Sequence, residues 1–119
     1  ALVGQHLKKN ILFDIKNKNQ LDKINKNSVY QYYPIDNLSK DIKKLSNENN
    51  KVIHLNSEPI KVDEILHDNN LNLLNGSLIK KKELYNLKSI YSKKYMNIKS
   101  YFYNKKKILY YIKKYLHDN

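Results

Sequence analysis

The chain has 119 residues, a size typical of one small domain, and a formal net charge of +12 at pH 7. It contains no cysteine, which excludes a disulfide framework, a cysteine-based zinc or iron–sulfur site and a thiol nucleophile. The apolar run Ile108–Ile112 is only about a quarter of the roughly 20 residues that cross a bilayer, so we expect no transmembrane segment. Part of the charge reflects an AT-rich gene, because lysine and asparagine codons can be written with A and T alone.

Charge is distributed unevenly along the chain, which codon bias does not explain. Residues 1–78 hold 11 lysines against nine acidic residues, a net charge of +2. Residues 79–119 hold 12 lysines against Glu83 and Asp118, a net charge of +10. We therefore expect one domain made of a near-neutral region of helices and loops, 1–78, and a basic, Lys/Tyr-rich helical segment, 79–119.

The first elements of the chain give mixed signals. Leu7, Ile11 and Ile15 recur every four residues, as on one face of a helix, but the run Ile11–Ile15 is equally compatible with a strand. Residues 17–27 are rich in asparagine and lysine and predict a loop with at most one helical turn.

A helix is expected shortly after Tyr30–Tyr33, which precedes a proline and is therefore predicted to be extended. Asp36 is a favourable N-cap for this helix. The apolar residues that follow are spaced as on one face of a helix that ends near residue 47. They are Leu38, Ile42 and Leu45.

Two more elements are expected before residue 70. The β-branched run Val52–Leu55 predicts a short strand. Ser57 as a cap and Pro59 near the first turn predict the start of a helix that ends near Asp68. The dipeptide Asn75-Gly76 then marks a turn, and the serine after it is expected to cap the next element.

The tetrapeptide Leu-His-Asp-Asn occurs twice, at 66–69 and at 116–119. Its histidine and aspartate are possible metal ligands. We favour a structural interpretation, in which the histidine complements the negative end of a helix dipole and the asparagine adopts the left-handed conformation that ends a helix. We expect neither a metal ion nor another cofactor.

From Leu78 onward the apolar residues follow at intervals of three or four and predict a long amphipathic helix. Lys105 interrupts the series, so a helical hairpin bent near 104–107 fits equally well. The predicted fold is therefore mainly α: a small helical domain with a long basic C-terminal helix or hairpin and at most a minor β element. The apolar stripe consists of Leu84, Leu87, Tyr91, Tyr95, Ile98, Phe102, Leu109, Ile112 and Leu116.

Lysines and tyrosines share one face of this predicted helix. Lysine ammonium groups neutralise phosphates and tyrosine rings stack on unpaired bases, so the mixture favours nucleic acid, and RNA in particular. A solvated face, or a surface for anionic lipid or an acidic protein, is the alternative. The candidate RNA-binding residues are Lys81, Lys82, Lys88, Lys93, Lys99, Lys106, Lys107, Lys114, Tyr85, Tyr103 and Tyr110.

The chain has no arginine, since all 23 basic residues are lysine. Arginine is the residue that reads guanine and grips phosphate with a planar fork, so we expect binding to the RNA backbone without sequence specificity. A small basic protein of this kind, with a less charged part left for neighbouring proteins, is typical of a structural component of a large ribonucleoprotein, such as a ribosomal protein on rRNA. Ala1 as first residue suits the removal of a leader, which favours a mitochondrion or plastid over the cytoplasm.

A second interpretation needs no nucleic acid. The stripe from Leu84 to Leu116 would then pair with another helix, and the protein would be an assembly or scaffold subunit of a protein complex. An enzyme is not expected, because the four histidines lack metal-binding spacing and two glycines cannot build a phosphate-binding loop. Nothing in the sequence points to a small-molecule substrate.

Overall fold

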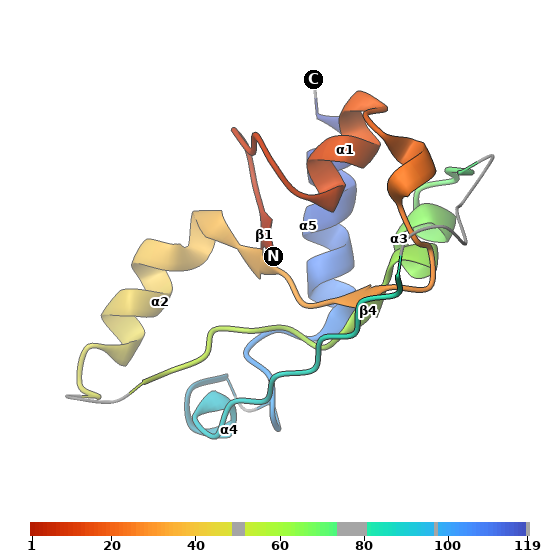
Figure 1. The fold of residues 1–119 in the computed structure, drawn as a ribbon. Helices are drawn as coiled ribbons and strands as arrows, with labels where there is room; N and C mark the ends of the chain where they lie inside the picture. Colours follow the sequence, from red (N-terminus) through yellow and green to blue (C-terminus); the bar gives the residue numbers. More distant parts are fainter. Residues whose placement is uncertain (49–51, 74–80, 97, 119) are drawn as a thin grey trace.

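The structure is a computed structural model that describes residues 1–48, 52–73, 81–96 and 98–118 (Figure 1). Helices account for 43% and strands for 10% of it. The fold is therefore mixed α/β, and the predicted mainly α fold is wrong. In chain order the elements are β1 (Leu2–Val3), α1 (Ile11–Asn17), the 3-10 helix η1 (Leu21–Lys23), β2 (Val29–Tyr30), β3 (Tyr33–Pro34), the 3-10 helix η2 (Ile35–Asn37), α2 (Leu38–Leu45), β4 (Ile60–Lys61), α3 (Val62–Asp68), α4 (Ser92–Met96) and α5 (Lys105–His117).

The strands form two separate pairs. β1 pairs in parallel with β3, with Leu2 opposite Tyr33, and β2 pairs antiparallel with β4, with Tyr30 opposite Ile60. The stretch predicted to be extended before the proline thus contributes to both pairs. The strand predicted at Val52–Leu55 is wrong, because this segment is irregular and has no strand partner among the described residues.

Helix α5 is the centre of the fold. Ile108, Ile112 and Tyr115 are buried, because their spacing of four and three residues places them on one face of the helix. This face packs against α1, α3, β1 and β3. In Figure 1, α5 runs behind the strands with α1 near its C-terminal end and α3 beside it.

The predicted long C-terminal helix or hairpin is wrong. Residues 81–91 contain no helix, and two separate helices, α4 and α5, follow them. The backbone N–H of Val29 donates to the carbonyl of Glu83 (2.8 Å), and the N–H of Tyr85 donates to the carbonyl of Val29 (3.0 Å). This stretch therefore runs parallel to β2, as Figure 1 shows. Contacts with a distant strand have overridden the helical spacing of the apolar residues.

The break between α4 and α5 has a local cause. Ser100 adopts a φ of 70°, in the left-handed region that a right-handed helix cannot contain. Asn104 then takes the N-cap position of α5, where its Oδ1 accepts a hydrogen bond from the N–H of Lys107 (2.8 Å). The interruption predicted near 104–107 is thus the first turn of α5.

The remaining helix predictions are confirmed in part. α2 lies where the sequence predicts a helix, and η1 is the single helical turn expected in 17–27. Asn37 rather than Asp36 holds the N-cap position of α2. α3 begins at Val62, later than predicted, because strand β4 precedes it, and Ser57 caps no helix: its hydroxyl accepts a hydrogen bond from the N–H of Tyr32 (3.0 Å).

One turn of α2 reverses the predicted burial. Ile42 is exposed, whereas the neighbouring Asp41 is buried. Asp41 Oδ2 accepts hydrogen bonds from the hydroxyls of Tyr33 (2.8 Å) and Tyr103 (2.5 Å). A buried carboxylate is tolerated where hydrogen bonds replace its hydration, and these two tyrosines provide them.

The run Ile11–Ile15 lies in helix α1, so of the two alternatives for it the helix is confirmed and the strand is wrong. The strand of the N-terminal segment is β1, at Leu2–Val3, where none is predicted. The turn predicted at Asn75-Gly76, the serine after it and the first residues of the predicted long helix, 78–80, lie outside the described residues.

Candidate nucleic-acid interface

Helix α5 presents a basic surface on the side away from the core. Because Ile108, Ile112 and Tyr115 occupy its buried side, the residues on the opposite side of the helix point outward. Tyr110 is 65% exposed in the middle of this surface, and the helix contains no acidic residue. We call this surface the α5 basic face and define it by Lys106, Lys107, Tyr110, Lys113 and Lys114, of which the four lysines are exposed.

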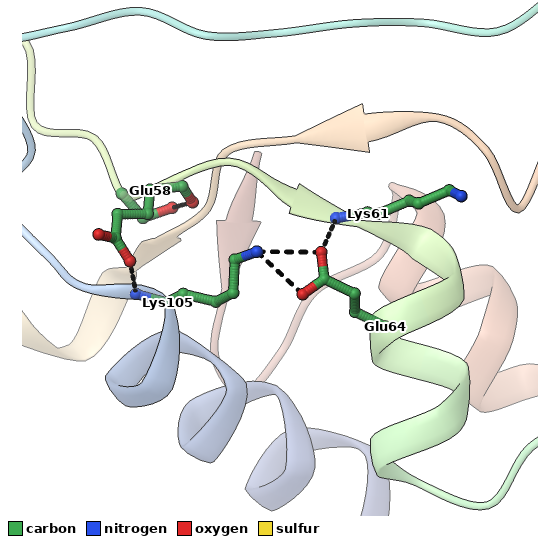
Figure 2. Close-up of polar contacts among 5 residues, drawn as sticks. Glu58, Lys61, Glu64 and Lys105 are labelled. Atoms are coloured by element: carbon green, nitrogen blue, oxygen red, sulfur yellow. Dashed lines mark hydrogen bonds and ion pairs between the residues drawn. The ribbon is translucent and has the colours of Figure 1, made fainter.

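The N-terminal end of α5 is held by two carboxylates (Figure 2). Glu58 Oε2 accepts a hydrogen bond from the backbone N–H of Lys105 (2.7 Å). The Nζ of Lys105 donates to both oxygens of Glu64, at 3.1 and 2.9 Å. Glu64 also accepts a hydrogen bond from the backbone N–H of Lys61 (3.1 Å) at the start of α3. Lys105 therefore ties α5 to α3 and is not part of the α5 basic face.

The lowered pKa of Glu64 agrees with its ion pair to Lys105. Burial acts to raise the pKa of its carboxyl, but the hydrogen bonds from Lys105 and Lys61 outweigh burial, and the pKa lies below its ordinary value. Both side chains of the Glu64–Lys105 pair are more than a third exposed, so solvent screens their attraction. The pair fixes the direction of α5 more than it stabilises the fold.

The C-terminal end of α5 is held by a lysine from α1. Lys16 Nζ donates to the carbonyls of Tyr115 (2.8 Å) and Asp118 (2.7 Å) and lies 4.5 Å from the centre of the Tyr115 ring. A cation is favourable there because the last carbonyls of a helix carry partial negative charge. With both ends fixed, the lysines of the α5 basic face keep a defined spacing.

The two Leu-His-Asp-Asn tetrapeptides end α3 and α5 and contact each other. His117 Nε2 lies 3.0 Å from Asn69 Oδ1. Both histidines fall in the last turn of a helix, as the structural interpretation expects. The predicted left-handed asparagine is wrong for the first copy, because Asn70 and not Asn69 has a positive φ, of 53°. No group of His, Cys, Asp and Glu in the described part of the chain could hold a metal ion.

A shallow groove of about 630 Å³ runs along the α5 basic face. Lys106, Leu109, Tyr110 and Lys113 line one side, and the acidic Glu58 and Asp68 lie at the other. Glu58 is already occupied by the N-terminus of α5. The α5 side of the groove combines an apolar and aromatic surface with two lysines, an arrangement that accommodates a phosphate backbone beside a stacked ring, and Asp68 is the acidic residue opposite them.

The structure distributes the predicted binding residues over several elements. Four of them lie together on the α5 basic face: Lys106, Lys107, Lys114 and Tyr110. The others share no helix face with these four, because the single long helix does not exist. They lie in the extended stretch 81–90 (Lys81, Lys82, Tyr85 and Lys88), in α4 (Lys93) and in the connection to α5 (Lys99).

Tyr103 cannot take the stacking role predicted for it. Its ring is only 1% exposed, and its hydroxyl donates to Asp41 and accepts from Asn37 Nδ2 (3.1 Å). Burial, together with the hydrogen bond to Asp41, raises the pKa of this hydroxyl. Lys107 Nζ lies 5.3 Å from the centre of the ring, so Tyr103 supports a lysine of the interface from below.

Sequence reasoning missed one residue of the α5 basic face, Lys113. In a single helix that starts at Leu84 and turns by about 100° per residue, Lys113 falls beside the apolar stripe and not on the polar face. A wheel restricted to α5 and centred on Ile108 and Ile112 places Lys113 beside Lys106.

Comparisons with protein-family models, with curated proteins and with solved structures give no significant match. Within the described part of the chain, no helix has the length and apolar character needed to cross a membrane.

Proposed function

We propose that this protein binds the backbone of RNA through the α5 basic face, without sequence specificity, as a small structural component of a large ribonucleoprotein. The observation that carries the proposal is the composition of that face: four exposed lysines around an exposed Tyr110, with no acidic residue on the helix. rRNA is the RNA that we expect, and no catalytic step is part of the proposal.

The chemistry of the face suits phosphate rather than base edges. Each lysine ammonium acts as a point charge that displaces condensed counterions when it meets a phosphate. Without arginine, the chain lacks the planar fork that reads guanine. Tyr110 supplies an aromatic surface that tolerates any unpaired base. Affinity should therefore depend strongly on salt and weakly on sequence.

The salt dependence of RNA binding tests the proposal. We expect the triple variant Lys106→Gln, Lys107→Gln and Lys114→Gln to flatten the slope of log affinity against log salt by about two to three units. All RNA sequences should weaken alike, because none of these lysines reads a base. Fluorescence anisotropy with labelled single-stranded RNA at several salt concentrations measures both quantities.

Helix α2 offers a matched control. Lys40, Lys43 and Lys44 are exposed on a helix that projects away from α5 (Figure 1). Their replacement by Gln removes the same charge from a different surface. If this control flattens the slope as much as the α5 variant does, binding follows net charge alone and the α5 basic face is not the interface.

A second candidate function, contact with a neighbouring protein, is favoured by the stretch 84–90. Leu84, Leu87 and Ile90 are 65%, 57% and 88% exposed, and such exposed apolar residues mark interaction surfaces. This surface replaces the helix-pairing stripe of the scaffold alternative. Of the C-terminal members of that stripe, Phe102 and Ile112 are buried within the protein itself and Leu109 and Leu116 are half-buried. A purified protein free of a nuclease-sensitive absorbance excess at 260 nm, with no affinity for RNA, would favour this candidate.

A further inference from the structure

A cavity of about 480 Å³ opens between three extended stretches of the chain, separate from the α5 basic face. Its walls come from residues 30–33 and 54–56, from Tyr85 and Leu87, and from Ala1. The side chains that matter here are Tyr30, Tyr32, His54, Asn56, Tyr85 and Leu87. We call this cavity the tyrosine groove. It is larger than a solvent-filled gap between packed side chains, and aromatic rings dominate its walls.

The groove has a rigid frame. Asn56 Nδ2 donates to the carbonyl of Leu87, and the carbonyl of Asn56 accepts hydrogen bonds from the N–H groups of Phe102 (2.9 Å) and Tyr103 (3.2 Å). Gln31 is buried and joins Leu87 to the strand region by further hydrogen bonds. These contacts fix the distance between the walls, so the groove is formed before any ligand arrives.

Two polar atoms of the groove residues have no hydrogen-bond partner in the described part of the chain. They are the hydroxyl of Tyr32 and Oδ1 of Asn56, and both residues are more than nine-tenths buried. Buried polar groups are normally paired, because an unpaired one loses its bonds to water and gains nothing in return. A phenylalanine at 32 would avoid this loss. Both atoms have less than 1 Å² of accessible surface, so they lie behind the walls of the groove and a ligand in it does not reach them.

Aromatic stacking defines the rim of the groove. The rings of Tyr30 and Tyr85 lie 5.7 Å apart at an interplanar angle of 23°, and Tyr32 meets Tyr30 edge to face at 6.4 Å. Tyr85 is 48% exposed, so one face of the stacked pair is open to a third ring. A flat ligand can extend this stack at low entropic cost, because the tyrosine rings are already ordered.

We propose that the tyrosine groove receives one unpaired nucleobase of the RNA strand held by the α5 basic face. The base stacks against the Tyr30–Tyr85 pair, and the aromatic and apolar walls of the groove enclose its ring. Every nucleobase presents a flat face to an aromatic ring, so this arrangement does not require one sequence. The inference rests on the proposed function, since the α5 basic face supplies the attachment to the backbone.

Uncharged nucleosides test the groove separately from the α5 basic face. Uridine and adenosine carry no phosphate, so they probe the groove alone. In NMR titrations of the full chain we expect saturable shifts of the Tyr30, Tyr85 and His54 ring resonances. The absence of such shifts up to the solubility limit of both nucleosides would overturn the proposal, even if RNA binding through α5 is observed.

The substitution Tyr85→Ala gives a second, sharper test. It removes the exposed ring of the stacked pair, so nucleoside affinity should fall by about fivefold or more, the effect of one lost stacking contact. The matched control is Tyr101→Ala, which removes a tyrosine that does not line the groove and whose hydroxyl bonds to Asn86 (2.6 Å), so affinity should be unchanged. Equal affinity of wild type and Tyr85→Ala would overturn the assigned contact.

RNA strands separate the remaining outcomes. A single-stranded RNA should bind more tightly than an abasic strand of equal charge, and Tyr85→Ala should abolish this difference without changing the salt slope. Groove binding of nucleosides without any affinity for RNA would refute the proposed function and assign the groove to a free nucleoside or nucleotide. Equal binding of both strands would refute the groove proposal and leave the proposed function intact.

Discussion

The side-chain amide of Gln31 pairs with both backbone groups of Leu87: Nε2 donates to the Leu87 carbonyl at 2.7 Å, and Oε1 accepts from the Leu87 N–H at 2.7 Å. Nε2 also donates to the carbonyl of Ser57 (2.8 Å). One buried side chain thus extends the strand-like pairing of Val29 with Leu84 by another step. This contact holds residues 83–87 in an extended conformation, although their apolar spacing favours a helix.

We expect Gln31→Leu to destabilise the protein by about 2–4 kcal/mol, because the Leu87 N–H and the Ser57 carbonyl lose their partner. Urea unfolding followed by circular dichroism measures the loss. Gln5→Leu is the control, since Gln5 is exposed and surface substitutions change stability by about 0.5 kcal/mol or less. Equal effects of the two variants would show that the Gln31 contacts do not hold the stretch 83–87.

Stability should fall steeply in alkali. Burial raises the pKa of the Tyr32, Tyr33 and Tyr103 hydroxyls above the ordinary value of 10.0, and hydrogen bonds to Asp41 add to the effect for Tyr33 and Tyr103. Below that value these tyrosines are neutral in both states and their contribution is complete. Above it the unfolded chain loses protons that the folded protein keeps, so each tyrosine lowers the free energy of unfolding by about 1.4 kcal/mol per pH unit.

The measurement is urea unfolding between about pH 9 and about pH 12. Tyr32→Phe should make the slope shallower by about 1.4 kcal/mol per pH unit, because one tyrosine whose pKa is raised no longer titrates. An unfolding free energy that stays constant across this range would contradict the burial of these hydroxyls.

Asp41→Ala should cost about 2–4 kcal/mol, because it leaves the buried hydroxyls of Tyr33 and Tyr103 without their acceptor. Thermal unfolding at neutral pH measures the loss. Asp22→Ala, at an exposed aspartate of η1, is the control and should have little effect. If the two variants unfold alike, the Asp41 cluster contributes nothing to stability.

Gly4→Ala should destabilise the protein by about 1–3 kcal/mol through overpacking. A Cβ at this position would lie 2.3 Å from Cγ2 of Ile35, and Gly4 has a φ of 158°. In an Ile35→Ala background the added methyl group finds space, so the cost of Gly4→Ala should shrink. A double-mutant cycle by urea unfolding measures this coupling, and a cost that is unchanged in that background would contradict the close approach.

Local sequence determined the helices whose apolar residues face the core of the protein itself. The spacing of Ile108, Ile112 and Tyr115 fixes the buried side of α5 and, with it, the outward direction of the neighbouring lysines. The concentration of lysine in residues 79–119 is likewise a property of the sequence alone. The basic character of the candidate interface and four of its five residues could therefore be predicted.

Only the tertiary structure decided which segments with helical apolar spacing do not form a helix. It also decided which tyrosines are buried. Leu84 and Leu87 follow a helical interval, but Val29 and Gln31, more than 50 positions away in the chain, supply hydrogen bonds that hold this stretch extended. The burial of Tyr103 depends on Asp41, 62 positions away, which accepts a hydrogen bond from its hydroxyl. The tyrosine groove requires three separate stretches at once. Side-chain spacing records only neighbours within a few turns, whereas burial and backbone pairing depend on partners that the folded chain alone brings together.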